Sequence, residues 1–75
     1  LPLHQLHPMN ATTLTPTELH RTWVAIERNG GGFCERLACA WFHADDRNKA
    51  RLDHAFEHLL AEFGPGSLYY TNRAL

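Results

Sequence analysis

Few side chains in this sequence have the types and spacing that catalysis requires. Cys39 and His43 are four residues apart, so on a helix they would share one edge, where an imidazole base can activate a thiol. No other nucleophile and base are paired in this way, and a chain of 75 residues offers little volume for a substrate pocket. We therefore expect no catalytic residues and no enzymatic activity.

The histidines and cysteines could also suggest a metal centre. His54 and His58 stand at i and i+4, and Cys34, Cys39 and His43 are the further candidate ligands. No C-x-x-C or H-E-x-x-H arrangement is present, however. His54 and His58 are expected to face water, and Cys34 is expected to face the apolar side of its helix. We predict neither a metal ion nor another cofactor.

Three consecutive glycines, Gly30-Gly31-Gly32, precede the most apolar segment of the chain. Because helix N-termini attract anions, a phosphate-binding loop is one interpretation. The known fingerprints also need a preceding strand and either G-x-G-x-x-G or a following Lys-Ser/Thr, and none of these occurs here. The glycines instead predict a turn between two helices, with close approach beneath the bulky Phe33 and Trp41.

Basic side chains recur at i, i+4, i+7 and i+11 along the last predicted helix, where they form one outward-facing stripe: Arg47, Arg51, His54 and His58. Asp53 and Glu57 are placed to one side of it. The stripe could contact a nucleic-acid backbone, with this helix acting in a helix-turn-helix-like pair, or bind an acidic protein surface. It could equally be an ordinary solvated face. The formal net charge of −1 weakens the nucleic-acid interpretation, since phosphate binding usually depends on more cations.

The composition indicates one small globular domain in residues 9–75, because 44% of the residues are hydrophobic and 20% are charged. Residues 1–8 differ from the rest, with two prolines and no charge, and we interpret them as an extension upstream of a natural start at Met9. A native disordered arm is the alternative. The chain has no apolar run long enough to span a membrane. Cys34 and Cys39, roughly 8–9 Å apart on a helix, are too distant for a disulfide, which favours reduced thiols in the cytoplasm.

Helix signals predict an all-α fold, a compact three-helix domain with helices over about 16–28, 33–44 and 46–63, an irregular N-terminal arm and an irregular C-terminal tail. Thr15-Pro16-Thr17-Glu18 matches a capping box with proline in the first turn. Asn29-Gly30 and Gly64-Pro65 supply stops, and either aspartate of Asp45-Asp46 can cap the last helix.

The helix over 33–44 carries apolar residues on about half of its circumference, which one neighbouring helix cannot cover. We therefore expect it to be the central helix and predict a homodimer through it. The aromatic types enriched at binding hot spots give the candidate protein-binding residues: Phe42, Trp41, Tyr69 and Tyr70. Trp23 and Trp41 are expected in the core, and Phe42, at the edge of the apolar arc, is the favoured contact residue.

Five segments of the sequence resemble small accessory proteins encoded by temperate phages and prophages of proteobacteria: ERNGGGF (27–33), AWFxAD (40–45), NKAR (48–51), AF (55–56) and FGPGS (63–67). The resemblance covers about residues 14–67 and carries no catalytic or binding motif, so it assigns no residue a role. It implies a cytoplasmic product in a bacterial host that acts by stoichiometric binding.

Together these features predict a protein that binds and modulates a host or phage protein without catalysis, with inhibition of a host protein as the favoured mode. Such a partner would be a transcription or quorum-sensing regulator, RNA polymerase or a defence complex. The alternative is a helix-turn-helix-like regulator that binds nucleic acid through the helix over 46–63. No membrane partner is expected.

Overall fold

Residues 14–70 of the computed structural model are described here, and they fold into four α-helices without any strand among them. The helices are α1 (Pro16–Asn29), α2 (Gly31–His43), α3 (Asp46–Ala55) and α4 (Glu57–Phe63). The all-α prediction is thus confirmed. The predicted division at residue 9 and the N-terminal arm lie outside the described residues.

The start of α1 follows the predicted capping box. The Thr15 hydroxyl accepts a hydrogen bond from the backbone N–H of Glu18 at 3.1 Å, and the Glu18 carboxylate accepts one from the Thr15 N–H at 2.9 Å. Pro16 occupies the first turn, where its missing N–H costs no helical bond. The helix ends at Asn29, one residue beyond the predicted end.

The predicted glycine turn joins α1 to α2. Gly30 is both the C-cap of α1 and the N-cap of α2. Gly31, with a φ of 86°, is the first residue of α2. The helix therefore begins two residues earlier than predicted. The close approach that requires a glycine is to Cys34 and not to the larger aromatic residues: a Cβ at Gly30 would meet the Cys34 side chain, with its Sγ at 2.7 Å, and the Ile26 carbonyl oxygen at 2.9 Å.

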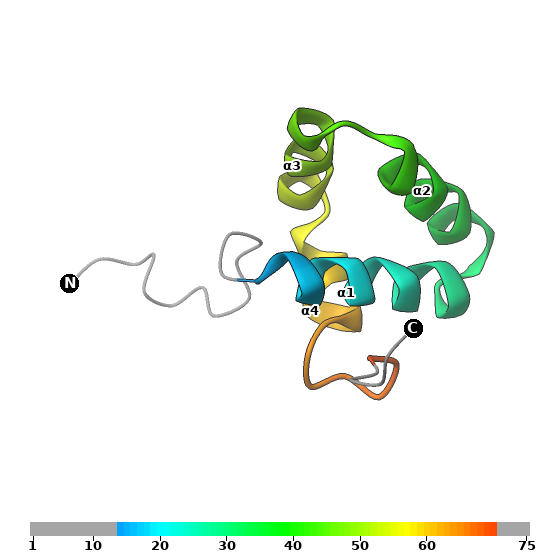
Figure 1. The fold of residues 1–75 in the computed structure, drawn as a ribbon. Helices are drawn as coiled ribbons and strands as arrows, with labels where there is room; N and C mark the ends of the chain where they lie inside the picture. Colours follow the sequence, from blue (N-terminus) through cyan, green and yellow to red (C-terminus); the bar gives the residue numbers. More distant parts are fainter. Residues whose placement is uncertain (1–13, 71–75) are drawn as a thin grey trace.

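The prediction of one helix over 46–63 is wrong, because the chain leaves helical geometry at Phe56. Phe56 has φ −118° and ψ 37°, and its carbonyl accepts the backbone N–H groups of Leu59 and Leu60, which starts α4. Figure 1 shows α4 turning away from α3 to lie alongside α1. Phe56 is neither glycine nor proline, so local sequence signals favoured a continuous helix.

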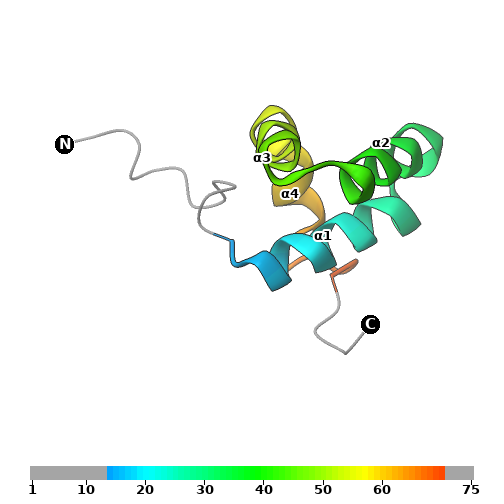
Figure 2. The ribbon, with the colours of Figure 1, turned by 45° about the horizontal axis from the view of Figure 1, so that its top comes forward.

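The helix that organises the core is α1, which contacts both α2 and α4, whereas α2 has fewer contacts with α3. Helix α1 buries Thr22, Trp23, Ala25 and Ile26. The expectation that residues 33–44 form the central helix is therefore wrong. In both ribbon views, α2 and α3 lie on one side of α1 (Figures 1 and 2). Helix α2 buries only Cys34, Ala38 and Trp41, so residues 14–70 leave part of its broad apolar arc uncovered.

The segment after α4, which was predicted to be irregular, folds back on the core in part. The ring of Tyr69 packs on that of buried Phe63, with centroids 5.1 Å apart. The Ser67 hydroxyl accepts the backbone N–H groups of Tyr69 and Tyr70 at 3.1 and 3.2 Å, which shapes the turn. Leu68, between them, is 99% exposed.

Candidate functional site

A buried carboxylate links three of the helices. Asp53 of α3 is 7% exposed, and its Oδ1 accepts hydrogen bonds from the indole N–H of Trp23 on α1 and of Trp41 on α2, each at 2.9 Å. The two indole rings stack, with centroids 5.5 Å apart and an interplanar angle of 15°. This Trp23–Asp53–Trp41 triad fixes how α3 sits against the other two helices.

The triad meets the hydrogen-bonding needs of groups that the fold buries. An indole N–H removed from water without an acceptor destabilises the folded state by about 1–3 kcal/mol. Here Asp53 Oδ1 accepts both indole N–H groups. Within residues 14–70, no fully buried side-chain nitrogen or oxygen lacks a hydrogen-bond partner. The hydrogen bonds are charge-assisted when the carboxylate is ionised, which makes them stronger than bonds between neutral groups.

Sequence reasoning missed Asp53, which it placed beside the basic stripe on the outer face. A usable signal was present nevertheless. Trp23 and Trp41 were both expected in the core, and a buried indole N–H requires an acceptor. Asp53 follows Leu52, a residue of the apolar face, and its helical position brings it to the two rings.

A cation lies against the same cluster. The Lys49 ammonium is 4.5 Å from the centroid of the Trp41 ring, in cation–π geometry. Lys49 stands one helical turn before Asp53 on α3, and its side chain is half-buried.

The four predicted protein-binding residues have different environments. Trp41 is 5% exposed and belongs to the core. Phe42 is half-buried, and its ring makes edge contacts with Trp41 at 5.2 Å and with His20 at 5.4 Å. Tyr70 is also half-buried, whereas Tyr69 is 49% exposed. Of the four, Tyr69 therefore offers the most surface to a partner.

Within residues 14–70, the exposed large apolar side chains are Phe33, Leu68 and Tyr69. Phe33, which the sequence analysis did not select, is 67% exposed on the first turns of α2. Its ring lies 6.3 Å from that of the half-buried Phe56 at the α3–α4 junction. Half-buried Leu37 follows one turn later on the same helix face. We call Phe33, Leu37 and Phe56 the α2 apolar face.

The break at Phe56 divides the predicted basic stripe. Arg47, Arg51 and His54 are exposed on α3, whereas His58 is exposed on α4, which runs in another direction. The four residues therefore do not follow one continuous helix. His54 Nδ1 also lies 3.7 Å from the Glu57 carboxylate, so an acidic residue adjoins the stripe.

Cys39 and His43 do meet on the surface of α2. Cys39 Sγ lies 3.8 Å from His43 Nδ1, and the same nitrogen is 2.9 Å from the Cys39 carbonyl oxygen. Cys34 is buried on the apolar side, as expected, and both thiols are free. In the part of the chain that the structure describes, no three His, Cys, Asp or Glu residues are grouped so that they could hold a metal ion.

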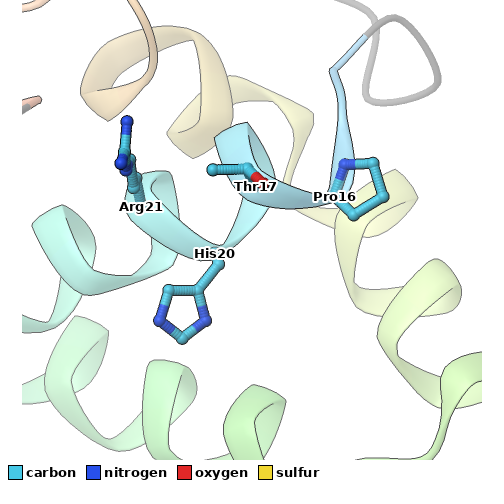
Figure 3. Close-up of a pocket in the computed structure, with 4 residues that line it drawn as sticks. All are labelled: Pro16, Thr17, His20 and Arg21. Carbon is cyan, nitrogen blue, oxygen red and sulfur yellow. The ribbon is translucent and has the colours of Figure 1, made fainter. Parts of the chain in front are cut away.

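Two hollows adjoin the N-terminal half of α1 and share Pro16 and His20. The first, of about 350 Å³, is lined by Pro16, Thr17, His20 and Arg21. Figure 3 shows His20 directed toward α2 and Arg21 projecting from another side of α1.

The second hollow, of about 320 Å³, lies between α1 and α3. Eight residues line it: Pro16, Leu19, His20, Trp41, Asp46, Lys49, Ala50 and Asp53. We call it the Asp53 pocket. It is the place where the buried triad reaches the surface.

No known protein family, curated protein or solved structure matches this chain. None of the four helices is long and apolar enough to cross a lipid bilayer.

Proposed function

We propose that this protein acts without catalysis, by binding another protein through the α2 apolar face. The observation that carries the proposal is the 67% exposure of Phe33, because its apolar neighbours Leu37 and Phe56 are themselves only half-buried. Aromatic side chains in such positions are typical of the anchors that dominate protein–protein binding energy. Leu68 and Tyr69 add exposed apolar surface beyond α4.

The class of partner follows from the resemblance to phage and prophage accessory proteins. It favours a cytoplasmic host protein that is inhibited by stoichiometric binding, such as a transcription or quorum-sensing regulator, RNA polymerase or a defence complex. Among the described residues, the Cys39 thiol and the His43 imidazole form an exposed pair on α2, next to a hollow lined by Glu27, Glu35, Arg36 and Cys39.

Affinity capture from a bacterial host lysate tests this proposal. The wild type should retain a specific protein that Phe33→Ser does not retain, while Ala61→Ser, a change at an exposed position of α4, should retain it as well as the wild type does. Because Phe33 is largely in water, the melting temperature of Phe33→Ser should remain close to that of the wild type. Equal capture by Phe33→Ser would contradict the proposal.

A second copy of the chain is another partner that the α2 apolar face could accept, which would make the protein a homodimer through α2. Sedimentation velocity at micromolar concentration decides this point. A dimer that Phe33→Ser converts to a monomer supports it. A strict monomer for the wild type leaves a foreign protein as the partner.

A nucleic-acid-binding regulator is the alternative function, favoured by one observation. Arg47, Arg51 and His54 are all exposed on α3, which follows α2 after a short turn, as a recognition helix would. Salt-sensitive binding of duplex DNA that is lost in an Arg47→Ala, Arg51→Ala double variant would support this function. Absence of DNA binding at low salt would exclude it.

A further inference from the structure

The Asp53 pocket contains the carboxylate of a buried residue, and one oxygen of this carboxylate has no partner among the residues that the structure describes. Asp53 Oδ1 accepts both indole N–H groups, and within residues 14–70 neither a hydrogen bond nor an ion pair involves Oδ2. No fully buried side-chain oxygen lacks a partner in that range, which agrees with an Oδ2 that reaches the accessible surface. Since Asp53 lines the pocket, that surface is the pocket wall.

Asp53 is a buried residue, only 7% exposed, and a carboxylate in such a position is normally paired with a cation because its charge is otherwise poorly solvated. The two tryptophans donate hydrogen bonds but bring no positive charge. The described part of the chain places no cation within ion-pair distance of Asp53. The pocket therefore offers a negative charge without a full partner, and the exposed Asp46 carboxylate at its wall adds to that potential.

The position of Lys49 indicates which kind of ligand the rest of the Asp53 pocket can bind. Its ammonium lies 4.5 Å from the centre of the Trp41 ring, so this ring already accepts a cation beside its stacking contact with Trp23. Pro16 and Leu19 supply apolar walls against which an alkyl stem can pack. An aromatic face, a carboxylate and an apolar wall together suit a guanidinium group on an aliphatic chain.

We propose that the Asp53 pocket binds a guanidinium group, with its plane on the Trp41 ring and an N–H donated to Asp53 Oδ2. Guanidinium is preferred over ammonium because it is planar, is less strongly hydrated and stacks on aromatic rings. Lys49 competes for the same ring face, and the ligand displaces it into water. The pocket is separate from the α2 apolar face, so this inference does not rest on the proposed function.

Titration with N-acetyl-L-arginine amide tests the site, and the neutral isostere N-acetyl-L-citrulline amide is the matched control. The full chain carries two tryptophans, and both belong to the triad, so their indole N–H signals in 15N-correlated NMR spectra report directly on Asp53. We expect saturable shifts of these signals at millimolar arginine derivative and none with the citrulline derivative. Equal shifts with both ligands, or no saturable shift with the arginine derivative, would overturn the proposal.

Two variants sharpen the test. Lys49→Met removes the competing ammonium and should strengthen binding by about two- to fivefold, the effect of deleting one repulsive surface charge. Asp53→Asn retains an acceptor for the indole N–H groups but removes the charge, so it should fold and lose binding. If Asp53→Asn does not fold, the arginine and citrulline derivatives can still be compared on Lys49→Met, and this comparison shows whether the pocket selects a guanidinium group. Weaker binding by Lys49→Met would contradict the proposal.

The same titration separates two sources of the guanidinium group. Binding of free L-arginine as strong as that of the amide would support a small-molecule ligand. Selective binding of the N-acetylated amide, whose backbone is uncharged as it is within a chain, would support an arginine side chain of a partner protein. Both results uphold the guanidinium site.

Discussion

Trp23 and Trp41 stack with 5.5 Å between their ring centroids, and both donate their indole N–H to one oxygen of a single carboxylate. The two residues come from different helices, and the carboxylate comes from a third. Apolar contacts alone permit small shifts of one helix along another because they are not directional. Two hydrogen bonds to the same atom do not permit such shifts. The arrangement therefore sets the register of α3 against α1 and α2.

Removing this acceptor should destabilise the fold strongly. Asp53→Ala leaves two buried indole N–H groups without a partner, at about 1–3 kcal/mol for each, so we expect the free energy of unfolding to fall by roughly 2–5 kcal/mol. Asp53→Asn keeps a neutral acceptor and should lose about 1–2 kcal/mol. Urea denaturation followed by tryptophan fluorescence measures both. Equal losses in the two variants would show that the hydrogen bonds do not determine stability.

Local signals were sufficient to predict the start of α1, the turn between α1 and α2, and the start of α3. Thr15 with Glu18, the glycine turn at Gly30 and the Asp45 cap each act within a few residues, and the structure confirms all three. The Asp45 carboxylate accepts the Asn48 N–H at 2.8 Å. Such capping bonds depend on short sequence spacings, so a pattern can be read without knowledge of the tertiary fold.

The break at Phe56 and the role of Asp53 were not predictable in the same way, because both depend on residues distant in sequence. Asp53 bonds to Trp23, 30 residues away. If α3 continued straight, Leu59, Leu60 and Phe63 would extend along the axis of α3. The break at Phe56 instead lets α4 pack against α1, where these three side chains are buried. Tertiary packing determines both features. The residues around Phe56 include no glycine or proline that would indicate a helix break.

The candidate binding surface was predicted only in part, for a related reason. The excess apolar arc of residues 33–44 was recognised, but which of its members are left uncovered depends on where α1 and α3 pack. Phe42 contacts His20 and Trp41 and is half-buried, whereas Phe33, at the start of α2, is 67% exposed. The apolar arc could be predicted from the sequence, but the residues of the arc that remain exposed could not.

The glycine turn yields a contrast between neighbouring positions. Gly30→Ala places a Cβ against the Cys34 side chain and the Ile26 carbonyl oxygen, so we expect a loss of about 1–3 kcal/mol in the free energy of unfolding. Gly32→Ala meets open space within α2 and should instead be neutral or stabilising, by up to about 1 kcal/mol. Thermal unfolding followed by circular dichroism compares the two. A Gly30→Ala variant as stable as Gly32→Ala would contradict the packing of Cys34 against this turn.

The capping box of α1 should contribute measurably to stability. Thr15→Ala removes the hydroxyl that accepts the Glu18 N–H and should lower the free energy of unfolding by about 1 kcal/mol. Thr17→Ala is the matched control, since Thr17 is exposed inside the helix and alanine is the better helix former there. Chemical denaturation of both variants gives the difference. A loss in Thr17→Ala as large as that in Thr15→Ala would argue against a specific capping effect.

The two thiols should react at very different rates. Cys39 is exposed beside His43, whereas Cys34 is 7% exposed beneath Gly30, so a thiol reagent such as 5,5′-dithiobis(2-nitrobenzoic acid) should label Cys39 rapidly in the native protein. Labelling of Cys34 requires opening of the α1–α2 turn and should become fast only in denaturant. Mass spectrometry after brief labelling should find one modified site, and Cys39→Ser should abolish the fast phase. Rapid labelling of Cys34 in the native protein would show that the packing of α2 on α1 opens readily.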